Sequence, residues 1–179
     1  TQADWQRRRA DILRGFQEVA GPLPDPSRRV PLDVQVLQTE DTPQYRRIKL
    51  TYAAEPGDRV PAWLLVPKNL SSRTAAMLCL HPTSPLGKDR LIGLAGTPSC
   101  HYAHELAQLG FVCLAPDYPS FGEYKYDFHT QGAHYASGTM KAIWNNIRAV
   151  DLLSTRAEVD PKRIGCIGHS LGGHNAIFT

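Results

Sequence analysis

A serine near the end of the chain has the neighbours that nucleophilic catalysis requires. The segment Gly168-His169-Ser170-Leu171-Gly172 is a G-x-S-x-G pattern, which follows an apolar run and precedes a helix-like sequence. Ser170 is therefore predicted at the tip of a sharp strand-to-helix turn. Side chains two residues away would collide at such a turn, and the glycines at 168 and 172 avoid that collision. We predict a nucleophile at Ser170, with an incidental serine in a glycine-rich turn as the alternative.

Acyl transfer also needs two N–H donors for the negative charge that develops on the carbonyl oxygen. The first is predicted to be the peptide N–H of Leu171, at a helix N-terminus, where the helix dipole favours an anion. The second is expected from the loop His81-Pro82-Thr83-Ser84, which follows the apolar run 75–80. Because Pro82 has no N–H, we assign this donor to Thr83. The alternative is that His81 caps a strand and the loop is purely structural.

The segments that must position these groups alternate between strand and helix. Residues 75–80 and 111–115 are continuous apolar runs, which are typical of parallel strands covered on both faces. Helices are predicted at 100–109 and 138–154, the second with an apolar stripe at helical spacing. A last strand at 163–168 leads into the serine. This alternation predicts the α/β class, with a mostly parallel, doubly wound sheet.

The N-terminal region, residues 1–44, is predicted to be a helix followed by a proline-rich extended connector. Residues 4–20 place apolar side chains at spacings of three and four, opposite arginines, which predicts an amphipathic helix. Residues 22–31 hold four prolines and are expected to be extended. A short strand is a candidate at 34–37.

Two further strands are predicted at the start of the sheet. Residues 45–53 and 60–66 alternate in the manner of strands and flank the turn Glu55-Pro56-Gly57-Asp58. They are expected to form a hairpin.

Four motifs then carry a family resemblance. They are Leu78-Cys79-Leu80-His81-Pro82, Ala115-Pro116-Asp117-Tyr118-Pro119 with Phe121-Gly122-Glu123, Val159-Asp160-Pro161-Lys162-Arg163-Ile164-Gly165, and the segment 168–173. In this order they resemble the α/β-hydrolase superfamily, most closely its dienelactone hydrolase and acetylxylan esterase-like branch. The resemblance covers about residues 45–179. It implies a serine hydrolase in which Ser170 is the nucleophile and the N–H groups of Leu171 and Thr83 form the oxyanion hole. Many relatives have His-Gly in place of His81-Pro82.

The resemblance also implies parts that this sequence does not contain. In the superfamily the acid and the histidine follow the nucleophile, whereas nine residues follow Ser170 here. We therefore expect residues 45–179 to be the N-terminal half of an α/β-hydrolase domain, ending just after the nucleophile elbow. The sheet is then incomplete at its C-terminal side, with an unpaired strand edge. The remaining half, in the same or another chain, is expected to supply the acid and the histidine.

The histidines of this chain are not expected to serve as the base. His169 adjoins Ser170 on the same turn, and His174 lies one helical turn along. His101 and His104 have no third ligand at a useful spacing, so a helix face is expected there and no metal site. We predict no cofactor.

Acidic residues and one loop complete the candidate residues. Asp117 and Asp151 precede the serine and are expected to have structural roles, as is the turn residue Asp160. The loop 118–137 contains His129, His134 and several aromatic residues, and Tyr118 is a candidate for pocket lining. A mobile surface loop is the alternative.

The composition narrows the choice of partner. The 179 residues are 42% hydrophobic and carry a net charge of +3, with basic residues in short scattered clusters, so no nucleic acid is expected. No apolar run reaches the roughly 18–20 residues of a membrane span, so no membrane is expected either. The four cysteines, Cys79, Cys100, Cys113 and Cys166, are predicted to be buried thiols. The compartment stays open: cytoplasmic, or secreted with a signal peptide removed.

The sequence thus predicts an enzyme that cleaves a small-molecule carboxylic ester through an acyl-enzyme. The 179 residues alone are expected to be inactive or nearly so, because they lack a base. Two alternatives stay open. One is a peptidase of the prolyl-oligopeptidase type, and the other is a non-catalytic hydrolase-like module that pairs with a partner chain.

Overall fold

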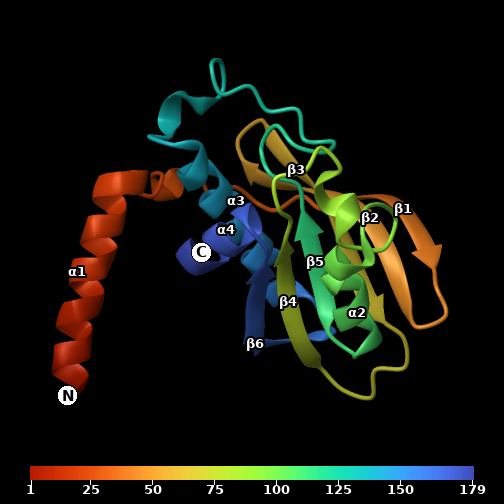
Figure 1. Ribbon diagram of the computed structural model, residues 1–179. Coiled ribbons are helices and arrows are strands. Elements are labelled where there is room, and N and C mark those ends of the chain that lie inside the picture. Colours follow the sequence, from red (N-terminus) through yellow and green to blue (C-terminus); the bar gives the residue numbers. More distant parts are fainter.

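Six strands form one sheet in the computed structural model, which describes residues 1–179 (Figure 1). In chain order they are β1 Gln35–Asp41, β2 Tyr45–Glu55, β3 Asp58–Pro67, β4 Thr74–Leu80, β5 Val112–Pro116 and β6 Val159–Gly168. The spatial order is β1-β2-β3-β5-β4-β6. The first three pairings in this order are antiparallel, whereas β4 pairs in parallel with β5 and with β6. Strands β2, β4, β5 and β6 therefore run in one direction within a mixed sheet, in which the parallel pairings are those of β4 with β5 and β6, and the predicted α/β class is confirmed.

Helices cover both faces of this sheet. The α-helices are α1 Gln2–Ala20, α2 Tyr102–Gln108, α3 Gly138–Thr155 and α4 Leu171–Phe178, and short 3-10 helices span Pro26–Arg28, Gly87–Arg90, Pro98–Cys100 and Gly132–His134. Alternate residues of β4 and β5 belong to different cores. Leu78 and Leu114 pack with residues of α3, whereas Cys79 and Cys113 pack with residues of α2. This two-sided burial explains why both strands are continuous apolar runs.

The predicted elements are found, with shifts at their ends. The hairpin of β2 and β3, the helices at 102–108 and 138–155 and the strand β5 lie where the sequence placed them. Strand β1 extends to Asp41 because it pairs with β2 as far as Arg46. Strand β6 begins at Val159, four residues before the predicted start, because Val159 pairs with Thr74 across an irregularity in the ladder.

Helix α1 projects from the body of the molecule (Figure 1). It forms as predicted, but only Ala20 is buried, and Trp5, Ile12 and Val19 are exposed. Its main aromatic contact is Phe16, which stacks on Phe178 of α4 with 4.5 Å between the ring centroids. The apolar face of α1 is therefore covered only near its C-terminal end.

One cysteine prediction is wrong. Cys79, Cys100 and Cys113 are buried free thiols, but Cys166 is exposed. Cys166 lies on β6, the last strand of the sheet, which has a neighbour on one side only. Separately, no helix of the chain combines the length and the hydropathy that crossing a membrane requires.

Candidate active site

Ser170 occupies the turn between β6 and α4 in an unusual backbone conformation. Its φ of 55° and ψ of −118° lie outside the regions that residues with a side chain prefer. Such a conformation costs about 1–3 kcal/mol and is found most often at functional sites. The Ser170 carbonyl accepts the N–H of His174 at 2.9 Å, so Ser170 is the N-cap of α4. The turn therefore presents an exposed hydroxyl at a helix N-terminus.

The glycines on either side of Ser170 serve different contacts. A Cβ atom at Gly168 would lie 2.2 Å from the carbonyl carbon of Gly172, within the same turn. A Cβ atom at Gly172 would instead lie 2.0 Å from the carbonyl oxygen of Leu80, at the end of β4. Gly172 thus allows the first turn of α4 to approach β4. This approach places the N-terminus of α4 against the residues that lead into the loop carrying Thr83.

Both N–H groups assigned to the oxyanion are free of partners within the chain. Leu171 is the first residue of α4, where helical N–H groups have no intrahelical acceptor, and its N–H donates to no protein atom. Thr83 is exposed in the irregular segment after β4, and its N–H also has no acceptor in the chain. Both donors are therefore available to a bound anion.

His81 is buried at the end of β4 and connects two loops. Its Nε2 accepts the N–H of Tyr118 at 3.1 Å, and its Nδ1 lies 2.7 Å from the carbonyl oxygen of Pro82. Since Nε2 accepts, the ring proton is on Nδ1 and is donated to that carbonyl. Burial lowers the pKa of His81, which keeps the ring neutral. With both nitrogens engaged, His81 holds the start of the Thr83 loop in place and is not free to act as a base.

A second connection between these loops is a group of charges, here called the Lys88 cluster: the buried Lys88 and Asp117 with the half-exposed Glu123. The Nζ atom of Lys88 lies 2.7 Å from a carboxylate oxygen of Asp117 and 2.7 Å from one of Glu123. Asp117 also accepts the N–H of Lys88 at 2.8 Å and the N–H of Glu123 at 3.0 Å. Burial alone would lower the pKa of Lys88, but the two carboxylates outweigh burial and raise it. Asp117, which we expected to form a turn, thus connects two loops by accepting from the backbone of each.

Sequence reasoning missed Lys88 and Glu123. Asp117 is 29 residues from Lys88, so no local pattern connects that pair, whereas Glu123 lies six residues after Asp117 within the same motif of the family resemblance. A further signal is a glycine in each loop. A Cβ atom at Gly87 or Gly122 would lie 2.1 or 2.3 Å from the same carboxylate oxygen of Asp117.

Tyr118 lines a cavity of about 160 Å³ beside Leu171. The other walls come from the segment after Tyr118 and from the first turns of α3 and α4: Pro119, Phe121, Phe128, Gly138, Thr139, Ala142 and Asn175. Much of the loop 118–137 is packed onto the core, since Tyr124 and Tyr126 are buried. Tyr118, the first residue of this loop, is buried and forms part of the cavity wall.

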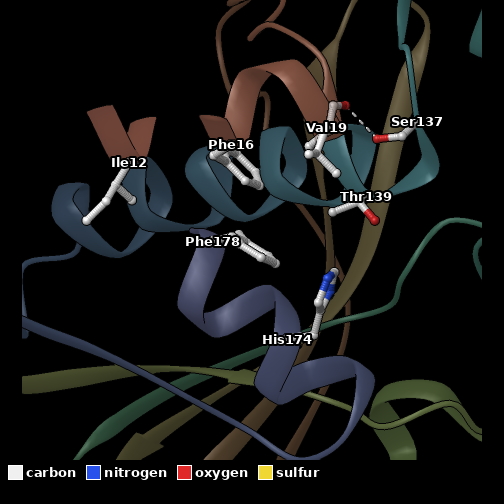
Figure 2. A pocket seen from close by; sticks show the side chains of 8 residues that line it. Ile12, Phe16, Val19, Ser137, Thr139, His174 and Phe178 are labelled. Atoms are coloured by element: carbon white, nitrogen blue, oxygen red, sulfur yellow. Dashed lines mark hydrogen bonds between the residues drawn. The ribbon is translucent and has the colours of Figure 1, made fainter. Parts of the chain in front are cut away.

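The remaining histidines and acids are engaged elsewhere or exposed. His174 faces a larger cavity of about 360 Å³ between α1 and α4, where its ring meets that of Phe178 edge-on at 4.6 Å (Figure 2). Asp151 forms ion pairs with Arg29 and Arg148. His104 shares a hydrogen bond of 2.7 Å with the hydroxyl of Tyr45. No side chain of the chain hydrogen-bonds to the Ser170 hydroxyl, and no group of three or more His, Cys, Asp and Glu residues is placed to hold a metal ion.

The known proteins that this chain resembles include hydrolases. Residues 99–179 match the prolyl oligopeptidase family of peptidases. The candidate hydrolase YtaP of Bacillus subtilis (strain 168) is 30% identical over 182 residues, which cover 96% of this chain and 59% of YtaP. The chain thus spans little more than half the length of that relative.

Solved structures show the same fold. A candidate acetyl xylan esterase from Bacteroides fragilis aligns with a TM-score of 0.78 at 19% identity, over 98% of this chain and 49% of that protein. The acetyl xylan esterase from Paenibacillus sp. R4 aligns with a TM-score of 0.61 at 25% identity, over 83% of this chain and 49% of that protein. The predicted resemblance to α/β-hydrolases of the acetylxylan esterase-like branch is confirmed. The chain carries about half of such a fold.

Proposed function

We propose that the full-length protein is a serine hydrolase that cleaves a carboxylic ester through an acyl-enzyme on Ser170. The observation that carries the proposal is the exposed Ser170 with its positive φ, at the N-terminus of α4, together with the unpaired N–H groups of Leu171 and Thr83. The hydrolase and esterase names of the relatives support the same class of reaction.

The reaction would proceed in two steps around Ser170. A base takes the serine proton as the hydroxyl oxygen attacks the ester carbonyl, and the two N–H groups stabilise the resulting oxyanion. The carbon–oxygen bond to the alcohol then breaks, and the alcohol leaves with that proton. Water hydrolyses the acyl-enzyme by the same route, which releases the acid and restores Ser170. Each oxyanion donor contributes about 3 kcal/mol, or 10²- to 10³-fold in rate.

The base and its acid belong to the second half of the hydrolase domain in this proposal. No histidine side chain of this chain hydrogen-bonds to the Ser170 hydroxyl, and the relatives are longer than the chain. The second half would add strands beyond β6, whose outer edge is unpaired. The 179 residues by themselves would then show feeble turnover at most, since only the oxyanion and binding contributions remain.

A fluorophosphonate probe tests this proposal directly, because it reacts only with an activated serine. The full-length protein should be labelled once per chain, at Ser170, and Ser170→Ala should abolish both labelling and hydrolysis of p-nitrophenyl esters. Ser72→Ala, at an exposed serine in the loop before β4, should leave both unchanged. Absence of labelling in a well-folded sample would instead favour a non-catalytic module that pairs with a partner chain.

A peptidase of the prolyl-oligopeptidase type is the second candidate, because residues 99–179 match that family. It would use the same serine and the same oxyanion donors, so labelling does not separate the two. Turnover of a proline-containing p-nitroanilide that exceeds turnover of simple esters would favour the peptidase.

A further inference from the structure

Helix α1 carries an apolar stripe that the rest of this chain leaves largely uncovered. The stripe consists of residues at spacings of seven, four and three, which share one side of the helix: Trp5, Ile12, Phe16 and Val19. Trp5 is 55% exposed and Val19 is 87% exposed. A helix in a protein draws most of its stability from packing such a face against another element. The stripe is therefore a candidate contact surface.

Two cavities flank the stacked rings of Phe16 and Phe178. The larger, of about 360 Å³, lies between α1 and α4, and Figure 2 shows Phe16 and Val19 pointing from α1 toward the side of α4 that carries Phe178. The smaller, of about 160 Å³, has Leu13 of α1 and Thr179 in its walls. Protein interiors hold few voids larger than one water molecule, which occupies about 30 Å³. The space between α1 and α4 is thus incompletely filled.

The walls of both cavities suit apolar side chains. Neither cavity is lined by an acidic residue, a lysine or an arginine. The hydroxyl of Ser137, in the wall of the larger cavity, already donates to the carbonyl of Ala20 at 2.7 Å and accepts the N–H of Met140 at 3.1 Å. The occupant of this space is therefore expected to contribute apolar side chains.

The unpaired edge of the sheet lies on the same side of the molecule as α1 (Figure 1). Strand β6 forms that edge and leads directly into α4, whose Ala176 packs on the core beneath α3. Strands added beyond β6 need helices over them. On the face that α3 and α4 cover, such helices would lie next to α4, where α1 also lies.

The relatives have enough additional chain to supply such helices. This chain covers 59% of YtaP and 49% of the Bacteroides fragilis protein. The second alignment includes 98% of this chain, and α1 with it. Residues that follow Thr179 in the full-length protein would start in the wall of the smaller cavity. They are thus placed to fill the space beside α1.

We infer that the apolar stripe of α1 is the docking surface for the second half of the hydrolase domain, the residues that follow Thr179 in the full-length protein. A helix of that half packs beside α4 and between α4 and the stripe, so α1 ties the N-terminal end of the protein to its C-terminal half. This inference goes beyond the proposed function, because it depends on the presence of the second half and not on the chemistry at Ser170.

Photocrosslinking of the full-length protein tests the contact. The amino acid p-benzoylphenylalanine replaces Ile12, and irradiation joins its benzophenone to a neighbouring C–H bond. Peptide mass spectrometry should find the cross-link within one chain, to a peptide beyond residue 179. The control places the same probe at Arg14, which is exposed and turned by about 200° around the helix from Ile12, and it should give no such cross-link.

A charge on the stripe tests its burial independently. Ile12→Asp should lower the melting temperature of the full-length protein by about 5 °C or more relative to Ala10→Asp, because the first carboxylate has to be buried against apolar side chains. Ala10 is exposed on the opposite side of α1, so Ala10→Asp carries the same new charge in the same helix without that burial.

Each alternative occupant of the stripe has its own signature. A cross-link between two chains would show that a second copy covers α1, and cross-links confined to residues 1–179 would show that nothing beyond them does. Either result overturns the inference, as would equal melting temperatures of the two Asp variants. Should the probe at position 12 prevent folding, the same probe in place of Trp5, on the same stripe, decides. Ser170→Ala should leave the cross-link unchanged, so failure of the proposed function can be distinguished from failure of this inference.

Discussion

Two buried lysines bind pairs of carboxylates in different parts of the molecule. In the Lys88 cluster, Asp117 and Glu123 receive the ammonium group. In a second group, here called the Lys141 cluster, Lys141 of α3 lies 2.7 Å from Glu55 and 2.6 Å from Asp58, at the turn between β2 and β3. In both clusters one lysine bridges two carboxylates, and one of those carboxylates also pairs with a second cation, Lys49 on Glu123 and Arg28 on Glu55. The elements that the two clusters join are different.

The Lys141 cluster is the more enclosed of the two. Both of its carboxylates are buried, and the rings of Tyr126 and Tyr135 lie 5.0 and 5.3 Å from the ammonium group. In the Lys88 cluster, the side chain of Glu123 is 47% exposed and also bonds to Lys49. A buried ion pair adds little net stability, but removing one partner leaves a buried charge and is costly. Substitutions in the enclosed cluster should therefore lower the free energy of unfolding. The cluster next to the Ser170 site should matter for the placement of loops.

Lys141→Met should produce the largest effect and confine it to stability. It leaves Glu55 and Asp58 buried together without their common cation, which should lower the free energy of unfolding by about 3–5 kcal/mol. Urea denaturation of the full-length protein measures this change, with Lys162→Met at an exposed position as the control. The kcat of the folded protein should stay near wild type. A loss of unfolding free energy below about 1 kcal/mol would contradict the large cost that we infer for leaving the two carboxylates without Lys141.

Asp117→Asn should have the opposite effect to Lys141→Met. It should change the free energy of unfolding less and lower the activity directly. One carboxylate oxygen becomes an NH₂ group, which cannot accept from Lys88 or from the N–H of Glu123. The Thr83 loop should shift, and kcat should fall about 10- to 100-fold with little change in KM, because a displacement near 1 Å costs about that much. Asp58→Asn in the other cluster is the matched control. It should lower the melting temperature and leave kcat unchanged, and equal losses of kcat in both variants would remove the distinction.

Acid should weaken the Lys141 cluster in a way that one variant can isolate. Burial alone would raise the pKa of Glu55, but bonds from Lys141, Tyr135 and Arg28 outweigh it and hold the pKa below its ordinary value. A carboxyl with a lowered folded-state pKa stabilises the protein above its unfolded-state pKa, and this stability is lost as pH falls through the folded-state pKa. Glu55→Gln should therefore flatten the fall in unfolding free energy between about pH 5 and pH 2. Glu18→Gln, at an exposed residue of α1, should keep the wild-type slope.

The contrast between local and distant contacts also explains what the sequence could predict. The turn at Ser170 was predictable because its strain and its glycines lie within a few consecutive residues. Strands β4 and β5 were predictable because burial on both faces leaves a continuous apolar run. The start of β6 was not, since Pro161 suggests a turn and the pairing at Val159 follows an irregularity.

The two lysine clusters could not be predicted from the sequence, because most of their charged residues are far apart along the chain. Lys141 meets carboxylates 86 and 83 residues away, and Lys88 meets one 29 residues away. On a helix or a loop, each of these lysines reads as a solvent-exposed side chain. Only the folded arrangement of β5, α3 and the β2–β3 turn brings the charges together.

Glu123→Gln should have the smallest effect, and it separates charge from geometry within the Lys88 cluster. Glu123 is half exposed and shares its carboxylate between Lys88 and Lys49, so its loss should cost no more than about 1 kcal/mol. Asp117 would still hold Lys88 and the backbone of both loops, so kcat should stay within about threefold of wild type. Kinetics and urea denaturation on the same sample check both values. A loss of kcat as large as that of Asp117→Asn would contradict this. It would mean that the total negative charge around Lys88 determines the position of the Thr83 loop, and not the bonds from Asp117 to the backbone of both loops.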